Sequence, residues 1–104
     1  MSSLRRYEIL LPLRFNDGRP VPPELVAETV IRLREQFGAV SSENQTIQGQ
    51  CSTKAWFIAT TWRVFVDVAD TPENRQYFRQ FKEQVKTDFQ QLDIWLTSYP
   101  IDVL

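Results

Sequence analysis

Apolar and polar residues alternate near the start of the chain, and this period of two predicts a strand from Leu4 to Leu13. One face of the strand carries Tyr7, Ile9, Leu11 and Leu13. The strand is expected to end before the segment Phe15–Pro20, since its Asp-Gly pair is typical of a turn and its proline cannot continue a ladder of hydrogen bonds.

A helical pattern follows this turn. Pro22 and Pro23 favour a first helical turn. The apolar positions then recur at three- and four-residue steps: Leu25, Val26, Val30, Leu33 and Phe37. The pattern predicts a helix that ends near Phe37, with Gly38 as its left-handed C-cap. The polar stretch from Val40 to Gln50 is typical of an exposed edge strand.

The stretch from Trp56 to Val68 predicts a long central strand, because one of its faces is apolar apart from a threonine. That face carries Trp56, Ile58, Thr60, Trp62, Val64, Val66 and Val68. The polar residues 51–54, which separate this strand from the edge strand, are expected to form a hairpin loop.

The second helix has a strong start signal. Thr71 is the expected N-cap and Pro72 the first helical residue. The apolar stripe of this helix is Tyr77, Phe78, Phe81, Val85 and Phe89. The helix is expected to end near Gln90, and the alternation from Asp93 to Tyr99 predicts a fourth strand that Pro100 terminates.

The predicted order of elements is therefore strand, helix, strand, strand, helix, strand, without a linker or an internal repeat. This is the order of a ferredoxin-like split βαβ fold. We expect one α+β domain over residues 1–104, in which two helices cover one face of a four-stranded antiparallel sheet. Right-handed crossovers place the first and third strands in the centre of the sheet and the other two at its edges.

The sheet face away from the helices is predicted to need a partner. Residues that alternate with the predicted core point toward this face, and many of them are apolar. The expected interface residues are Leu10, Phe57, Arg63, Phe65, Trp95 and Tyr99. A monomer rarely exposes an apolar patch of more than roughly 300–600 Å². We therefore expect this face to form a homodimer or to bind another protein. The competing interpretation is that the aromatic residues are scattered singly or covered by the C-terminal tail.

Composition narrows the function classes further. The chain has 104 residues, a formal net charge of −1, one cysteine and no histidine. Without imidazole, Ser–His–Asp triads and most zinc sites are excluded, so we expect a non-enzymatic domain without a cofactor. Cys51 has no second cysteine for a disulfide, and no apolar stretch has the length of a membrane span or the form of a signal peptide. These features favour the cytoplasm.

Nucleic acid is a disfavoured partner. The open face of this fold is where RNA-recognition motifs stack bases, but only Phe65–Val68 matches the end of the strand pattern. Arg63 and Thr61 stand where an aromatic and a basic residue are expected, and Asp67 adds a negative charge. The net charge provides no excess positive field to attract phosphates.

The acidic residues around the start of the second helix offer a metal site in principle. Asp67, Asp70 and Glu73, together with Asp17, could supply oxygen ligands for magnesium. Helix capping and the helix dipole explain Asp70 and Glu73 without a metal. No metal site and no catalytic residue is therefore predicted.

The loop between the first strand and the first helix is the alternative binding site. Gly18 and Arg19 are its candidate contacts, because related folds bind small effectors through backbone N–H groups at a helix start. Pro20, Pro22 and Pro23 remove three such donors, so an ordinary turn is favoured. The alternative function is a regulatory domain that binds a small ligand at this loop or at the dimer seam.

Two segments resemble a known family. The runs Tyr7–Pro20 (YEILLPLRFNDGRP) and Val64–Asn74 (VFVDVADTPEN) are similar to those of small, uncharacterised bacterial proteins with a ferredoxin-like fold. The resemblance covers nearly the whole chain, and its motifs are turn and cap residues rather than reactive groups. It therefore implies the fold and a bacterial origin, and no activity.

Overall fold

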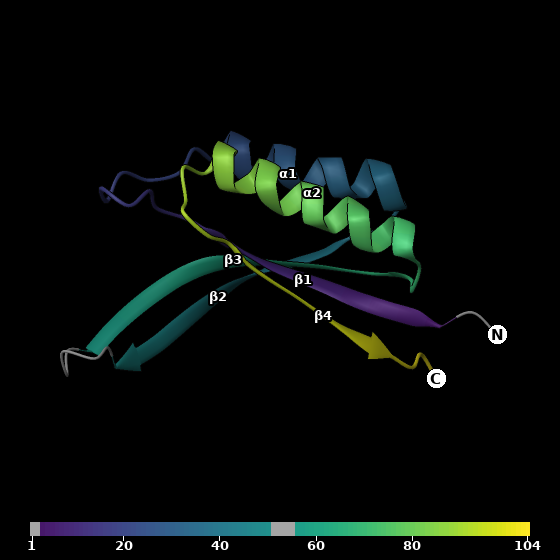
Figure 1. Ribbon diagram of the computed structural model, residues 1–104. Helices are drawn as coiled ribbons and strands as arrows, with labels where there is room; N and C mark the ends of the chain where they lie inside the picture. The colour runs from purple at the N-terminus through teal and green to yellow at the C-terminus, as the bar shows by residue number, and fades with distance from the viewer. Residues whose placement is uncertain (1–2, 51–55) are drawn as a thin grey trace.

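The six predicted elements are present in the computed structural model of the protein, which describes residues 3–50 and 56–104, and the side chains of these except at 44–50 and 56–60. In chain order the elements are β1 (Leu4–Pro12), α1 (Pro23–Phe37), β2 (Ser41–Gln50), β3 (Trp56–Ala69), α2 (Pro72–Asp88) and β4 (Trp95–Ile101). The strands form one antiparallel sheet in the order β2-β3-β1-β4. Both helices lie on the same side of the sheet (Figure 1). The α+β ferredoxin-like prediction is confirmed.

Local signals explain where the helices begin and end. Gly38 adopts a left-handed φ of 84° and donates its backbone N–H to the carbonyl of Arg34, so it ends α1 as a C-cap. The side chain of Thr71 accepts a hydrogen bond of 3.2 Å from the backbone N–H of Asn74, so it caps the start of α2. Both caps were predicted from the sequence.

The fourth strand differs from its prediction at both ends. It begins at Trp95 rather than Asp93, and it continues through Pro100, which pairs with Arg5, to Ile101. Proline is tolerated here because β4 is an edge strand, where a residue without an N–H group need not break a ladder on both sides. The expectation that Pro100 ends the strand is therefore wrong.

The core lies between the helices and the sheet. Its buried side chains come from the faces that the sequence pattern predicted: Tyr7, Ile9, Leu11, Leu33, Val64, Val66, Phe78, Phe81, Val85, Phe89 and Ile94 are among them. The ring of Tyr7 stacks on that of Phe78 with a centroid distance of 4.0 Å. Burial of these residues on one side fixes the register of the sheet, since a slip of one residue would move the apolar side chains of a strand to the opposite face.

An ion pair just before β4 makes the stability of the fold depend on pH in the acidic range. The carboxylate of Asp93 lies 3.1 Å from Nζ of Lys82 and also accepts the backbone N–H of Ile94. The hydrogen bond from Lys82, followed by that from Ile94, lowers the pKa of Asp93 below its ordinary value. The ionised carboxylate therefore stabilises the fold above the unfolded-state pKa of about 4, and this contribution is lost as the pH falls through the lower folded-state pKa.

We predict that Asp93→Asn lowers the melting temperature at neutral pH, because it removes the charged partner of Lys82. The difference in melting temperature between the variant and the unmodified chain should shrink as the pH falls from about 7 toward about 3. The native carboxyl is then increasingly protonated and, like asparagine, carries no charge. Thermal unfolding followed by circular dichroism at both pH values measures this difference. An equal difference at both values would contradict the assignment.

Candidate functional site: the open sheet face

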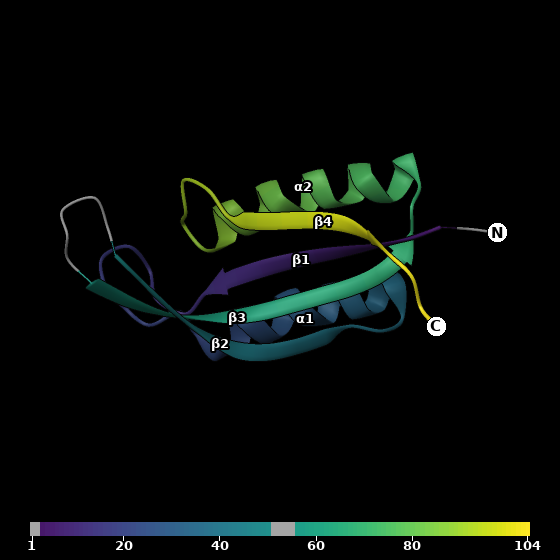
Figure 2. The same ribbon diagram turned by 90° about the horizontal axis from the view of Figure 1, so that it is seen from below.

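Neither of the helices in the described residues covers the second face of the sheet, which is called the open face (Figure 2). Its described residues alternate with the core positions along the two central strands, β1 and β3, and along the edge strand β4. They are Arg6, Glu8, Leu10, Thr61, Arg63, Phe65, Asp67, Trp95, Thr97 and Tyr99. The antiparallel registers place these side chains in adjacent rows, so neighbouring strands interact across the face.

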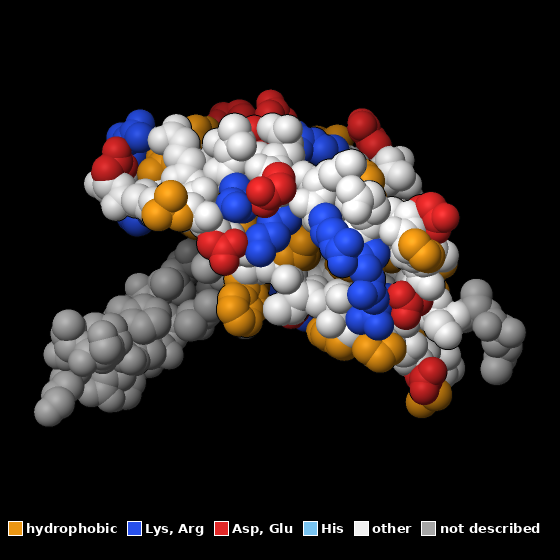
Figure 3. Space-filling view, in the orientation of Figure 1, with side chains coloured by type: hydrophobic (Ala, Val, Ile, Leu, Met, Phe, Trp, Pro, Cys, Tyr) orange, Lys and Arg blue, Asp and Glu red, His pale blue; other side chains and the backbone are white. Residues whose placement is uncertain are grey.

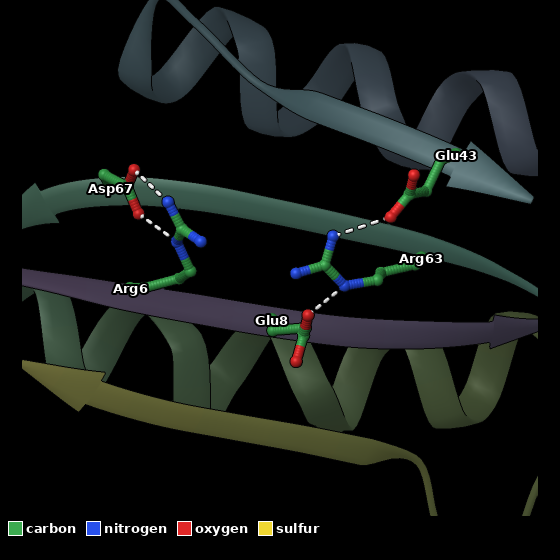
Figure 4. Close-up of polar contacts among 5 residues, drawn as sticks. All are labelled: Arg6, Glu8, Glu43, Arg63 and Asp67. Atoms are coloured by element: carbon green, nitrogen blue, oxygen red, sulfur yellow. Dashed lines mark hydrogen bonds and ion pairs between the residues drawn. The ribbon is translucent and has the colours of Figure 1, made fainter. Parts of the chain in front are cut away.

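A charged pair occupies one end of this face. Arg6 lies directly opposite Asp67 in the β1–β3 register. The guanidinium of Arg6 donates two hydrogen bonds to the carboxylate of Asp67, Nε to Oδ1 at 2.7 Å and the second nitrogen to Oδ2 at 3.0 Å (Figure 4). Such a bidentate pair fixes both side chains. It therefore compensates the negative charge that Asp67 brings to this face.

A second charged cluster lies in the middle of the sheet and connects three strands. Arg63 on β3 donates one hydrogen bond to Glu8 on β1 and another, at 2.8 Å, to Glu43 on β2 (Figure 4). Arg63 and Glu8 are mostly buried, with side-chain exposures of 19% and 20%, whereas Glu43 is 61% exposed. The cluster therefore links β2, β3 and β1 on the face that has no helices.

The ring of Phe65 lies against both arginines. The Cζ atoms of Arg6 and Arg63 are each 4.4 Å from its ring centroid. Cation–π contacts at this distance are favourable, and they hold the aromatic ring within the charged rows. The centre of the open face is therefore a mixed layer of charge and aromatic carbon, less apolar than the sequence pattern suggested.

Exposed aromatic side chains lie beside this layer on the edge strand. Trp95 is 67% exposed and Tyr99 is 40% exposed. The register places Leu10 between two neighbours, Trp95 on β4 and Arg63 on β3. Figure 3 shows hydrophobic side chains along the lower rim of the molecule, on the side away from the helices. These observations place five of the predicted interface residues on one face.

The sixth predicted interface residue cannot be placed on either face. Phe57 pairs with Gly49 in the ladder, but its side chain is outside the described residues, as is the whole of Cys51. Arg6 and Glu8 were not among the predicted interface residues. The alternation of β1 already placed both on this face, but only the register reveals that they pair with Asp67 and Arg63.

We predict that Arg63→Met destabilises the fold by about 1–2 kcal/mol, because Glu8 would lose its charged partner in a mostly buried position. The value is below that of a fully buried pair because water still reaches both groups. Urea unfolding measures it. Arg19→Met is the matched control, since the Arg19–Asp17 pair is more than half exposed, and it should have a much smaller effect. Equal effects would contradict a structural role for the Arg63 cluster.

The predicted contacts of the first loop lie in a tight turn. Gly18 has a φ of +90° and donates its backbone N–H to the carbonyl of Phe15. The backbone N–H and the guanidinium of Arg19 both donate to the carboxylate of Asp17, and these bonds lower the pKa of Asp17. The backbone donors at both positions are thus engaged within the turn.

An apolar groove lies beside this loop on the helix side of the sheet. Its volume is about 540 Å³. It is lined by Leu13, Val21, Pro23, Val26, Ala27, Val30, Ile31, Ser42 and Trp62. The indole Nε1 of Trp62 is buried and has no hydrogen-bond partner among the described residues. The sequence did not predict this groove, because its walls come from segments far apart in the chain.

Three of the four acidic residues considered for magnesium, Asp17, Asp67 and Asp70, are engaged by arginines. Asp67 pairs with Arg6, and Asp70 lies 3.1 Å from Nε of Arg5. In the part of the chain that the structure describes, no group of three histidine, cysteine or carboxylate side chains could hold a metal ion. Over the same residues, no helix is both long and apolar enough to cross a membrane.

Comparison with known proteins defines the fold class and goes no further. No family model and no curated protein matches the chain. A phage SAM lyase in complex with S-methyl-5'-thioadenosine has a TM-score of 0.67 at 13% identity, over 99% of this chain and 92% of the lyase chain. The GlnK–ATP complex of B. subtilis has a TM-score of 0.62 at 16% identity, over 97% of this chain and 84% of the GlnK chain. The apo phage SAM lyase has a TM-score of 0.58 at 17% identity, over 97% of this chain and 90% of the lyase chain. These similarities show the fold.

Proposed function

We propose that this protein is a non-enzymatic domain that self-associates through its open face. The observation that carries the proposal is the exposure of Trp95 and Tyr99 on the same sheet face as Leu10 and Phe65, a face that none of the described helices covers. Aromatic residues of this kind are enriched in the centres of protein interfaces and depleted on surfaces that stay wet. A second copy of the chain supplies the apolar surface that these residues lack within one chain.

The charged layer is compatible with burial in such an interface. Arg6 and Asp67 pair with each other, and Arg63 pairs with Glu8, so four of the charged groups are already neutralised within one chain. An unpaired charge would oppose the removal of water, whereas a hydrogen-bonded pair costs less to bury. Glu43 is the more exposed partner of Arg63, and it lies on β2, at the opposite edge of the sheet from the exposed aromatic residues of β4.

Sedimentation equilibrium tests self-association directly. We expect the average mass to rise from that of one chain to a multiple of it as the concentration increases through the micromolar range. Added salt should weaken the assembly only moderately, because its main contacts are apolar. A mass of one chain at every concentration would contradict the proposal.

A regulatory ligand-binding domain is the second candidate, favoured by the apolar groove beside the first loop. Its volume of about 540 Å³ is within the range of small-molecule sites, and its lining is apolar with a few polar groups. In two of the similar structures the same fold is in complex with S-methyl-5'-thioadenosine or with ATP. Both compounds are therefore included in the test.

Thermal unfolding in the presence of a metabolite panel tests this candidate. A ligand of the folded state raises the melting temperature. Ala27→Phe should abolish the increase if the ligand lies in the groove, whereas Arg19→Ala should abolish it if the ligand lies on the loop. A panel that raises the melting temperature of neither the unmodified chain nor the variants would count against this candidate.

A further inference from the structure

One strand of the sheet is longer than its inner neighbour. β3 extends over Trp56–Ala69, but β1 pairs only with its second part, Thr61–Ala69. β2 pairs with Trp56–Phe65. Among the strands of the described chain, Trp56–Thr60 therefore has a partner on the β2 side only. Figure 1 shows the two-stranded ribbon of β2 and β3 projecting past the ends of β1 and β4.

The free edge of this ribbon is suited to strand pairing. Over residues 3–50 and 56–104, its backbone N–H and C=O groups that would face a continued β1 have no strand beside them. The sequence Trp-Phe-Ile-Ala-Thr has high strand propensity and contains neither a charged residue nor a proline. Proteins usually protect an exposed edge with charged residues or proline, and the segment Trp56–Thr60 contains neither. A two-stranded ribbon alone is also only marginally stable.

The outer edge of β4 offers a matching surface. β4 pairs with β1 on one side and forms the margin of the sheet on the other. Its first five residues, Trp95–Tyr99, precede Pro100, which cannot donate to a further ladder. The outer edge of β2 is a weaker alternative, since that strand is rich in polar residues and belongs to the same ribbon.

We propose that the free edge of β3 at Trp56–Thr60 pairs with the outer edge of β4 at Trp95–Tyr99 in a second copy of this chain. This inference rests on the proposed self-association and specifies its geometry. Each copy contributes one edge of each kind, so the contact is head-to-tail and repeats until a ring closes. The sheet then continues from copy to copy, and when the ring closes the open faces lie on its inside, where they cover one another. The aromatic residues Trp95 and Tyr99 lie next to the seam.

Cysteine crosslinking tests this geometry. In a Cys51→Ser background, Ala59→Cys and Thr97→Cys are introduced into separate chains, because residue 59 lies in the free segment of β3 and residue 97 in the middle of the β4 segment proposed to pair with it. The two proteins are mixed and treated with a short thiol-reactive crosslinker. We expect a product of twice the chain mass, and a series of larger products when one chain carries both substitutions. Ala59→Cys mixed with Ser41→Cys, on the outer β2 edge, is the control and should not give this product.

The outcomes separate this inference from the proposal on which it rests. Sedimentation of the same variants shows whether they assemble, and circular dichroism shows whether they fold. An assembly whose 59–97 pair yields no more product than the control would overturn the strand pairing and leave self-association through the open face intact. A single-chain mass at all concentrations would overturn both.

Discussion

Trp95→Glu is expected to weaken self-association by about 2–4 kcal/mol, which raises the dissociation constant by about 30- to 1,000-fold. Trp95 is 67% exposed within one chain, so the substitution removes little intramolecular packing. It replaces a large apolar surface by a charge that would be desolvated without a partner in the interface. Sedimentation at a concentration where the unmodified chain is assembled measures the loss.

Two further variants make this result specific. Phe65→Glu alters the centre of the open face and should also dissociate the assembly. Leu92→Glu is the matched control, since Leu92 is 92% exposed but precedes β4 and lies outside the open face. An unchanged dissociation constant in Trp95→Glu, or an equal loss in Leu92→Glu, would contradict the role of the open face.

Phe89→Ala is expected to reduce the free energy of unfolding by about 3–5 kcal/mol. The side chain is 0% exposed, and its backbone N–H donates to the carbonyls of Val85 and Thr87 at the end of α2. Removing the ring leaves a cavity in the layer between helix and sheet. Because a domain of this size is stable by only about 5–15 kcal/mol, much of the protein could unfold at moderate temperature.

Urea unfolding of this variant locates the core independently of any partner. Leu92→Ala is the control, because the same kind of truncation at a solvent-exposed position should change stability by no more than about 0.5 kcal/mol. Similar losses in Phe89→Ala and Leu92→Ala would mean that Phe89 is not packed as described.

The fold was predictable because the buried positions recur along the chain with the periods of strands and helices. The alternation in β1 and β3 and the helical stripe that includes Phe78 and Val85 each identify one buried face. Thr71 and Gly38 mark helix ends through capping geometry that depends on a few neighbouring residues. The end of β4 was missed because its continuation past Pro100 depends on a neighbouring strand, not on its own sequence.

The site was predictable in part, for a related reason. Alternation assigns Arg63 and Phe65 to the open face, and it does the same for Arg6 and Glu8. Which residues face one another depends on the register between strands that are more than fifty positions apart in sequence. The unequal lengths of β1 and β3 also arise only when the strands are paired. The charged layer and the projecting ribbon could therefore be recognised only in the structure.

Hydroxyl-radical footprinting at increasing protein concentration tests most directly whether a second copy covers the open face. Oxidation of Trp95 and Tyr99 should fall as the protein assembles, while oxidation of Leu92, which lies outside that face, should stay constant. Equal oxidation of Trp95 and Tyr99 at all concentrations, in a sample whose mass shows assembly, would contradict burial of the open face.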